Sequence, residues 1–160
     1  MSRIGQRLRM LAGVVVVAAV LTACEAAPPD VTWYGNRTSV AAGPALFCEL
    51  SQDLTPRCSV TDGPIAQLSL HAEDAVQVNI PAEVAEQPWL LVISYADGSS
   101  STRTPLIDDG GKTLSWTVYP AGHPLQHIEL QVLTLTSDAA GQVQFTPLQV
   151  WALAITQLAG

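Results

Sequence analysis

The sequence predicts an all-β protein, an immunoglobulin-like antiparallel β-sandwich preceded by a signal-peptide helix. Three observations lead to this fold class. Apolar and polar residues alternate with a period of two in several short segments after residue 30. Turn signals such as Asp97-Gly98 separate these segments. Beyond the amino-terminal segment, no helix-period stretch of convincing length occurs. Short strands at this spacing are typical of a sandwich or a barrel.

The amino-terminal segment, residues 1–23, has the pattern of a secretory signal peptide. Three arginines at positions 3, 7 and 9 precede 14 uncharged residues, Met10 to Ala23. A positive start, a short apolar core and small residues before a cleavage site define such signals. As a helix, the apolar core rises only about 21 Å, well below the ~30 Å of a bilayer's hydrocarbon core. A membrane span is therefore the weaker interpretation.

Cys24 ends this apolar run, and the order Leu21-Thr22-Ala23-Cys24 resembles the bacterial lipobox. The resemblance implies that the Cys24 thiol carries a diacylglycerol, with acyl chains such as palmitate, and that Cys24 becomes the mature amino terminus. Two acyl chains on one residue would supply stable anchoring. The alternative is a secreted protein in which Cys24 is a free thiol. We expect a signal peptide at 1–23, a lipid-anchored tether at 24–30 and the sandwich domain at 31–160.

The charge of the chain after the signal is strongly acidic. Residues 24–160 hold 14 acidic and only 4 basic residues, a formal net charge of −10. Such a surface is repelled by nucleic acid phosphates and by anionic lipid headgroups. The composition therefore predicts no DNA or RNA partner and a solvated surface in an extracytoplasmic space. The signal and the lipobox resemblance add the expected location, on the extracytoplasmic face of the cell membrane.

Cys48 and Cys58 are the two cysteines left besides Cys24, with nine residues between them. In an oxidising compartment, an even pair at short spacing is most simply a disulfide. A redox-active or metal-binding pair is the alternative, which the lack of CxxC spacing disfavours.

The strands are predicted in order from alternation and from apolar runs. Strand segments are expected at VTWYGNRTSV (31–40), ALFCEL (45–50), IAQLSL (65–70), 76–80, PWLLVISY (88–95), 114–118, 128–135 and LQVWALAIT (148–156). With the strand after Asp97-Gly98, about nine or ten result. PAEVAEQP (81–88) has room for one helical turn, whereas 107–112 and 137–142 are expected to be loops.

Two details follow from the phase of these strands. Leu133 follows Val132 directly, which reverses the alternation and predicts a β-bulge or a crossover at this point. The alternation also places Trp116 and Ile128 in the interior and Ser115 and Glu129 in water. Trp89 and Trp151 are likewise expected in the core, and Trp33-Tyr34 is expected to pack rather than to form an exposed docking pair.

A family resemblance rests on several of these motifs together: the lipobox, the early cysteine pair, the strand Val-x-Val-x-Ile-Pro and the Pro-Trp-Leu strand that ends in Tyr95-Ala96-Asp97-Gly98. In this combination the chain resembles uncharacterised lipoproteins, a domain of unknown function, from actinobacteria of the corynebacterial and mycobacterial kind. The resemblance implies an envelope location and no assigned activity.

Residues suited to catalysis or metal binding form no recognisable motif. His123 and His127 stand four apart in HPLQH, but Pro124 argues against the helix that would place both rings on one metal. The acidic pairs Glu73-Asp74 and Asp108-Asp109 lie in expected loops. The sequence shows no G-x-S-x-G elbow and no phosphate-binding loop. We therefore predict no catalytic residue, no metal site and no cofactor.

The function expected from these observations is a non-enzymatic, lipid-anchored module that binds a protein or glycan of the cell envelope. The alternative is an extracytoplasmic hydrolase or a small-ligand carrier with a site built from loops, because a triad is recognised only by its geometry.

Overall fold

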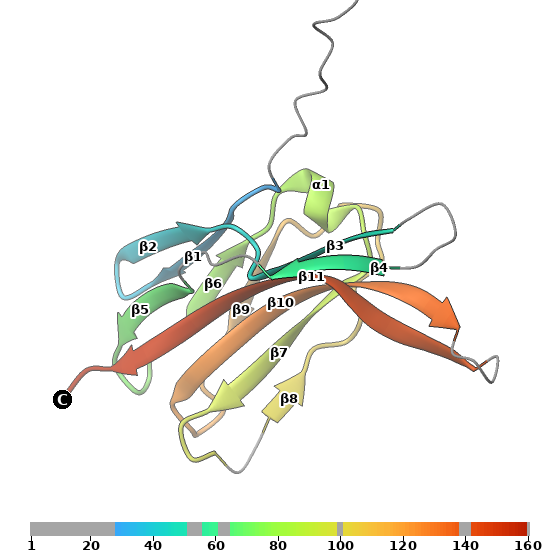
Figure 1. Ribbon diagram of the computed structural model, residues 1–160. Helices are drawn as coiled ribbons and strands as arrows, with labels where there is room; N and C mark the ends of the chain where they lie inside the picture. The colour runs from blue at the N-terminus through green and yellow to red at the C-terminus, as the bar shows by residue number, and fades with distance from the viewer. Residues whose placement is uncertain (1–27, 51–55, 61–64, 99–100, 138–141, 160) are drawn as a thin grey trace, which may run out of the picture.

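The computed structural model describes residues 28–50, 56–60, 65–98, 101–137 and 142–159. The predicted signal helix, Cys24 and most of the tether lie outside these ranges. Two sheets pack face to face in the described part, as the sequence predicts (Figure 1). The smaller sheet has four strands in the order β2 (Thr38–Ala42), β1 (Val31–Gly35), β6 (Val76–Asn79) and β9 (Ser115–Val118).

The larger sheet contains seven strands. Its order is β4 (Pro56–Val60), β3 (Leu46–Leu50), β11 (Val143–Gln157), β10 (Leu125–Ser137), β7 (Trp89–Tyr95) and β8 (Ser101–Arg103). The seventh strand, β5 (Ala66–Leu70), pairs with the end of β11 in parallel, whereas the other pairs are antiparallel. The single turn of helix expected in 81–88 is α1, Ala82–Ala85. Within the described ranges, no helix is long and apolar enough to cross a membrane.

The core lies between the inner faces of the two sheets. Trp33, Trp89 and Trp151 are fully buried, and they belong to one apolar cluster that both sheets share. Trp116 is half-buried and packs its ring edge against Trp89, with the ring centroids 6.3 Å apart. Ile128 is fully buried, whereas Ser115 is exposed and Glu129 half-exposed. The predicted phase of both strands is thus confirmed.

The bulge predicted near Val132 is confirmed. The register between β10 and β11 shifts between Val132 and Leu133, because Gln149 faces Val132 while Pro147 faces Leu133. The extra residue is therefore Leu148, on β11 rather than on β10. Leu133 then lies on the outer face of the larger sheet, next along that face from Gln131.

One predicted strand is wrong in its extent. Residues 31–40 form a hairpin rather than one strand: β1 turns at Asn36 and Arg37 and returns as β2. Both turn residues have positive φ, 45° and 61°. This is the geometry of a two-residue hairpin turn that usually carries glycine. The turn was not recognised from the sequence because its second position holds an arginine instead of the usual glycine.

Cys48 and Cys58 are joined by a disulfide, as their spacing predicts. They face each other across β3 and β4, with their Cα atoms 3.9 Å apart. Cys48 is buried and Cys58 is exposed. The bridge therefore fastens the edge strand β4, whose residues are all exposed, to the body of the larger sheet.

Candidate functional site

The ends of β10 and β11 next to their connecting loop extend beyond the rest of the larger sheet as a two-stranded ribbon. Residues 133–137 of β10 and 143–147 of β11 pair with each other, and in the described part of the chain they pair with no third strand. We call this ribbon the arm; it is the orange and red hairpin at the right of Figure 1. At its base, the Leu133 amide donates a 2.8 Å hydrogen bond to the Pro88 carbonyl oxygen.

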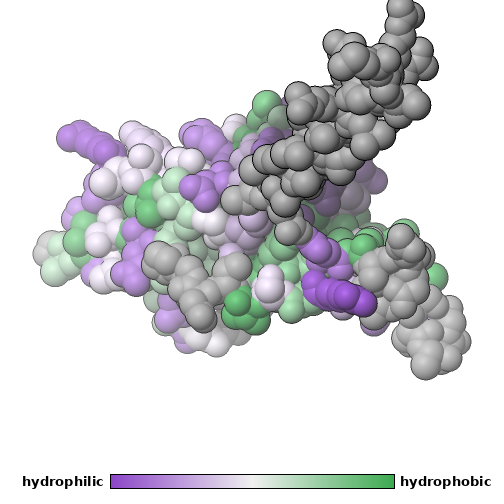
Figure 2. All heavy atoms as spheres, turned by 45° about the horizontal axis from the view of Figure 1, so that its top comes forward, coloured by the Kyte–Doolittle hydropathy of each residue, from purple (hydrophilic) through white to green (hydrophobic). Residues whose placement is uncertain are grey.

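The arm is amphipathic, because its strand pairs alternate between two faces. One face carries Leu133, Leu135, Val143, Phe145 and Pro147, and the other carries Thr134, Thr136, Gln144 and Thr146. On the polar face, the hydroxyls of Thr136 and Thr146 are 2.6 Å apart. On the apolar face, Leu135 is 62% exposed and Phe145 is 54% exposed. Hydrophobic side chains reach the surface at this end of the molecule in Figure 2.

A pocket of about 220 Å³ lies at the base of the arm, on the outer face of the larger sheet. Its lining residues come from four neighbouring segments: Leu90, Arg103, Leu106, Gln131, Leu133, Phe145 and Pro147. Strand register explains the grouping. Leu90 faces Gln131 across β7 and β10, and Leu133 faces Pro147 across β10 and β11.

Leu106 reaches the pocket because the chain after β8 stays on the edge of β7. Trp89 and Ile107 exchange two backbone hydrogen bonds, of 2.9 and 2.8 Å. Thr104 adds two more to Leu91, one from its amide at 3.0 Å and one accepted by its hydroxyl at 2.9 Å. This segment therefore continues the sheet edge that β8 begins, and it forms one wall of the pocket.

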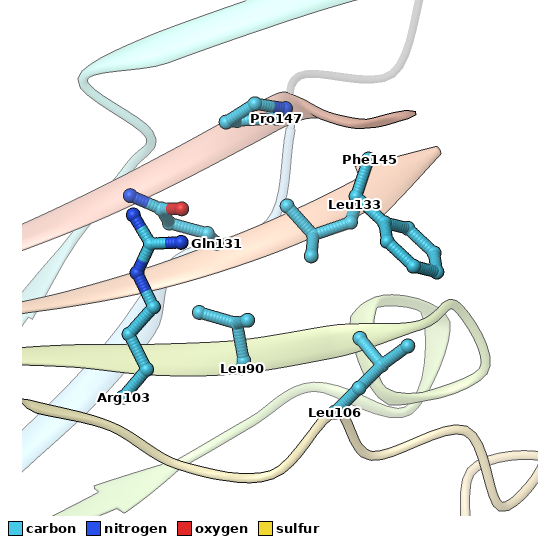
Figure 3. Close-up of a pocket in the computed structure, with 7 residues that line it drawn as sticks. All are labelled: Leu90, Arg103, Leu106, Gln131, Leu133, Phe145 and Pro147. Carbon is cyan, nitrogen blue, oxygen red and sulfur yellow. The ribbon is translucent and has the colours of Figure 1, made fainter. Parts of the chain in front are cut away.

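The pocket has a polar end and an apolar end. Arg103 and Gln131 lie side by side at one end, Leu106, Leu133 and Phe145 lie at the other, and Leu90 forms the floor between them (Figure 3). The amide nitrogen of Gln131 donates a 2.6 Å hydrogen bond to the Glu129 carboxylate, which also contacts His127 at 3.2 Å. Arg103 forms no ion pair with any residue that the structure describes.

A second hollow of about 550 Å³ lies beside the loops at the opposite end of β10. Its walls include Glu73, Tyr119 and Pro124. Tyr119 is well exposed, and the only charged group in this wall is acidic. An acidic wall in a domain that is already strongly acidic gives this hollow no group that would attract an anion.

The three histidines lie apart from the pocket's apolar end. His123 is at a loop, where its Nδ1 lies 3.0 Å from the Asp97 carboxylate and its ring stacks edge-on against Tyr95. His127 lies on β10 beside Glu129, and His71 is exposed. No group of three metal-binding side chains occurs among the described residues.

The acidic pairs sit in loops, as predicted, and two of their carboxylates support turns. Asp74 accepts a 2.8 Å hydrogen bond from the His71 amide. Asp109 accepts bonds from the Thr113 hydroxyl at 2.6 Å and from the Lys112 amide at 3.0 Å. The Thr113 hydroxyl is the main reason that the pKa of Asp109 lies below its usual 3.8. These two carboxylates therefore stabilise the loops in which they lie.

Sequence reasoning did not find the pocket residues Arg103, Gln131 and Phe145. Each lies on a different strand, and only strand order and register bring them together. One local signal was available: Leu133 and Leu135 alternate with threonines, opposite Val143 and Phe145, which alternate with Gln144 and Thr146. The alternation of β10 continues past Val132 without an extra residue, so this apolar row lies on the outer face of the larger sheet.

The chain is similar to a family of unknown function and to uncharacterised mycobacterial proteins. Residues 24–156 match the family described as "Protein of unknown function (DUF2771)". The chain is similar to uncharacterized protein Mb0899c of Mycobacterium bovis and to uncharacterized protein Rv0875c of Mycobacterium tuberculosis. Each is 26% identical over 129 residues, covering 78% of this chain and 76% of the relative. No solved structure matches the chain.

Proposed function

This chain belongs to the DUF2771 family of proteins of unknown function, and from that starting point we propose that it is a lipid-anchored binding module of the cell envelope. In this proposal Cys24 carries the lipid on the extracytoplasmic face of the cell membrane. The sandwich binds an envelope protein or glycan and performs no catalysis.

The anchor is supported by the signal pattern of residues 1–23 and by the lipobox that ends at Cys24. The position of Pro29 adds a geometric consequence, because its carbonyl oxygen is hydrogen-bonded to the buried Trp151. Only five residue steps separate Cys24 from Pro29, and they span at most about 17 Å when fully extended. A lipid on Cys24 would therefore hold the sandwich close to the membrane surface.

The observation that carries the binding role is the exposed apolar face of the arm together with the pocket at its base. Leu135, Val143 and Phe145 are all more than half exposed, on a ribbon with no further strand beside it in the described part. Natural sheets usually protect such edges with charges. Between Leu130 and Gly160 the sequence has a single charged residue, Asp138. Exposed apolar surface of this kind is typical of interaction sites.

The anchor is tested by intact-mass spectrometry of the protein purified from membranes. Cys24 should begin the mature chain and carry the mass of its acyl groups. Cys24→Ser should abolish that mass and leave an uncut precursor or released protein. A membrane form whose Cys24 bears no acyl mass would refute the anchor.

The binding role is tested by placing the photo-crosslinking residue p-benzoylphenylalanine at Phe145 in living cells. A discrete cross-linked adduct should form at Phe145. The same substitution at Tyr34, which is 47% exposed on the smaller sheet, is the matched control and should give none. Equal cross-linking at both positions, or none at Phe145, would contradict a binding surface on the arm.

A further inference from the structure

We propose that the pocket under the arm binds a carboxylate attached to a small apolar group. Arg103 binds the carboxylate, and Leu90, Leu106 and Phe145 contact the apolar group. This inference rests on the proposed binding role of the same face and names the chemistry that the site recognises.

The charge of Arg103 is the first argument. Arg103 is one of only four basic residues after the signal segment, against 14 acidic ones, and it is the only charged residue that lines the pocket. Its guanidinium lies at the polar end of the pocket and forms no ion pair in the described part of the chain. A guanidinium presents two parallel N–H donors that match a carboxylate. The pocket therefore selects an anion within an otherwise acidic domain.

Glu129 limits the charge of that anion. Its carboxylate lies beyond Gln131, to which it is hydrogen-bonded, and in the same cross-strand row as Arg103 through Val92. A carboxylate on this row repels a bound anion, and it repels a dianion more than a monoanion, although salt screens the effect. A dianion such as a phosphate monoester is therefore disfavoured relative to a monoanionic carboxylate.

The size of the pocket limits the rest of the ligand. About 220 Å³ is below the roughly 300–1,000 Å³ of typical small-molecule and cofactor sites. The space suits one aromatic or branched group with its carboxylate. Leu90, Leu106, Leu133, Phe145 and Pro147 surround that space with apolar atoms. A carboxylate of this kind occurs in a small free acid and at the last residue of a polypeptide.

The primary test compares 3-phenylpropionate with 3-phenylpropanamide, a neutral molecule of the same shape. The full lipid-anchored chain is reconstituted in lipid nanodiscs, and binding is measured by isothermal titration calorimetry. The acid should bind at least about tenfold more tightly than the amide, because a charge-assisted bond to Arg103 is lost in the amide. The amide also controls for partition into the lipid. Equal affinity of the two probes would overturn the proposal.

Variants assign the effect to the pocket. Arg103→Gln should remove the preference for the acid, whereas Arg57→Gln, on the edge strand β4 of the same sheet, should leave it unchanged. Phe145→Ser should weaken both probes and retain their ratio. Circular dichroism checks that each variant is folded, as expected for exposed positions. A preference for the acid that survives Arg103→Gln would also overturn the proposal.

Two further probes distinguish the sources of the carboxylate. The peptide Ala-Ala-Ala-Phe is compared as its free acid and as its carboxyl-terminal amide. Tighter binding of the peptide acid than of 3-phenylpropionate identifies a polypeptide terminus, and the reverse order identifies a small acid; both support the carboxylate site. If no acid binds but the cross-link at Phe145 still forms, the carboxylate ligand is refuted and the binding role of the arm is not. Loss of the cross-link as well would refute the binding role of this face.

Discussion

The indole nitrogen of Trp151 donates a 3.0 Å hydrogen bond to the carbonyl oxygen of Pro29, 122 positions away in the sequence. Trp151 is fully buried at the centre of the larger sheet, so this bond ties the start of the domain to its core. The indole nitrogens of Trp33 and Trp89 are also buried, but neither has a hydrogen-bond partner among the residues that the structure describes. The contribution of this one hydrogen bond to stability can therefore be measured by comparing tryptophans that are equally buried.

Trp151→Phe is expected to destabilise the fold more than Trp89→Phe does, by about 1 kcal/mol or more in the free energy of unfolding. Both changes remove similar volume, but only the first breaks a hydrogen bond, and the second removes an unpaired buried donor. Chemical denaturation of the two variants measures the difference. Hydrogen exchange of residues near Val31 should also become faster in Trp151→Phe only. Equal losses would mean that the bond to Pro29 contributes nothing.

Reduction of the Cys48–Cys58 disulfide should lower the free energy of unfolding by about 2–4 kcal/mol, because the bridge closes a short loop and restricts the unfolded chain. The double variant Cys48→Ser with Cys58→Ser should show a similar loss and should not respond to reductant. Its circular dichroism spectrum should remain of the β type, since β4 lies at the edge of the sheet. Peptide mapping that finds free thiols at both positions in protein isolated from cells without reductant would contradict the bridge.

Asp109 should make a small pH-dependent contribution to stability. Its pKa in the folded protein lies below 3.8, mainly because the Thr113 hydroxyl donates to the carboxylate. A lowered pKa means that this contribution is fully present above about pH 4 and disappears as the pH falls through the folded-state pKa. Thr113→Val should raise the pKa of Asp109 toward its usual value, as measured by carbon NMR of the carboxyl group. Thr117→Val, on the exposed face of β9, should leave it unchanged.

Much of the fold was predictable because the alternation of apolar and polar residues within a strand indicates which of its faces is buried. The alternation in 128–132 gave the correct phase, and the adjacent apolar residues Val132 and Leu133 gave the position of the bulge. The run 148–156 proved to be part of a strand rather than a helix, as its β-branched and aromatic residues indicated. Strand order and the parallel pairing of β5 with β11 were not predictable, because they depend on contacts between distant segments.

The pocket could not be predicted from the sequence for the same reason. No segment alone places Arg103 beside Gln131, because their neighbourhood is created by β7, which lies between their strands. The first hairpin was missed for a local reason: Asn36-Arg37 lacks the glycine that normally marks such a turn. An arginine tolerates this conformation only at a cost in free energy, which leads to a direct test.

Arg37→Gly should stabilise the fold by about 0.5–1 kcal/mol, because glycine adopts the positive φ of 61° without a steric penalty. Asn36→Gly is the matched control and should not stabilise. Asparagine already tolerates its φ of 45°, and its side chain donates a 3.3 Å hydrogen bond to the Ser69 carbonyl oxygen. Thermal denaturation compares the two. Stabilisation by the second change but not by the first would contradict the assigned turn.

Trp116→Ala tests the packing of the two sheets. Trp116 is half-buried on β9 and contacts Trp89 of the opposite sheet edge-on. Its truncation should cost about 2–3 kcal/mol in the free energy of unfolding, less than the ~3–5 kcal/mol for a fully buried aromatic residue. Ser115→Ala, one position earlier on the exposed face, should change it by about 0.5 kcal/mol or less. Urea denaturation measures both variants, and tryptophan fluorescence reports whether Trp89 becomes more accessible to water in Trp116→Ala. If Trp116→Ala proves as stable as Ser115→Ala, then β9 does not hold its predicted face against the larger sheet.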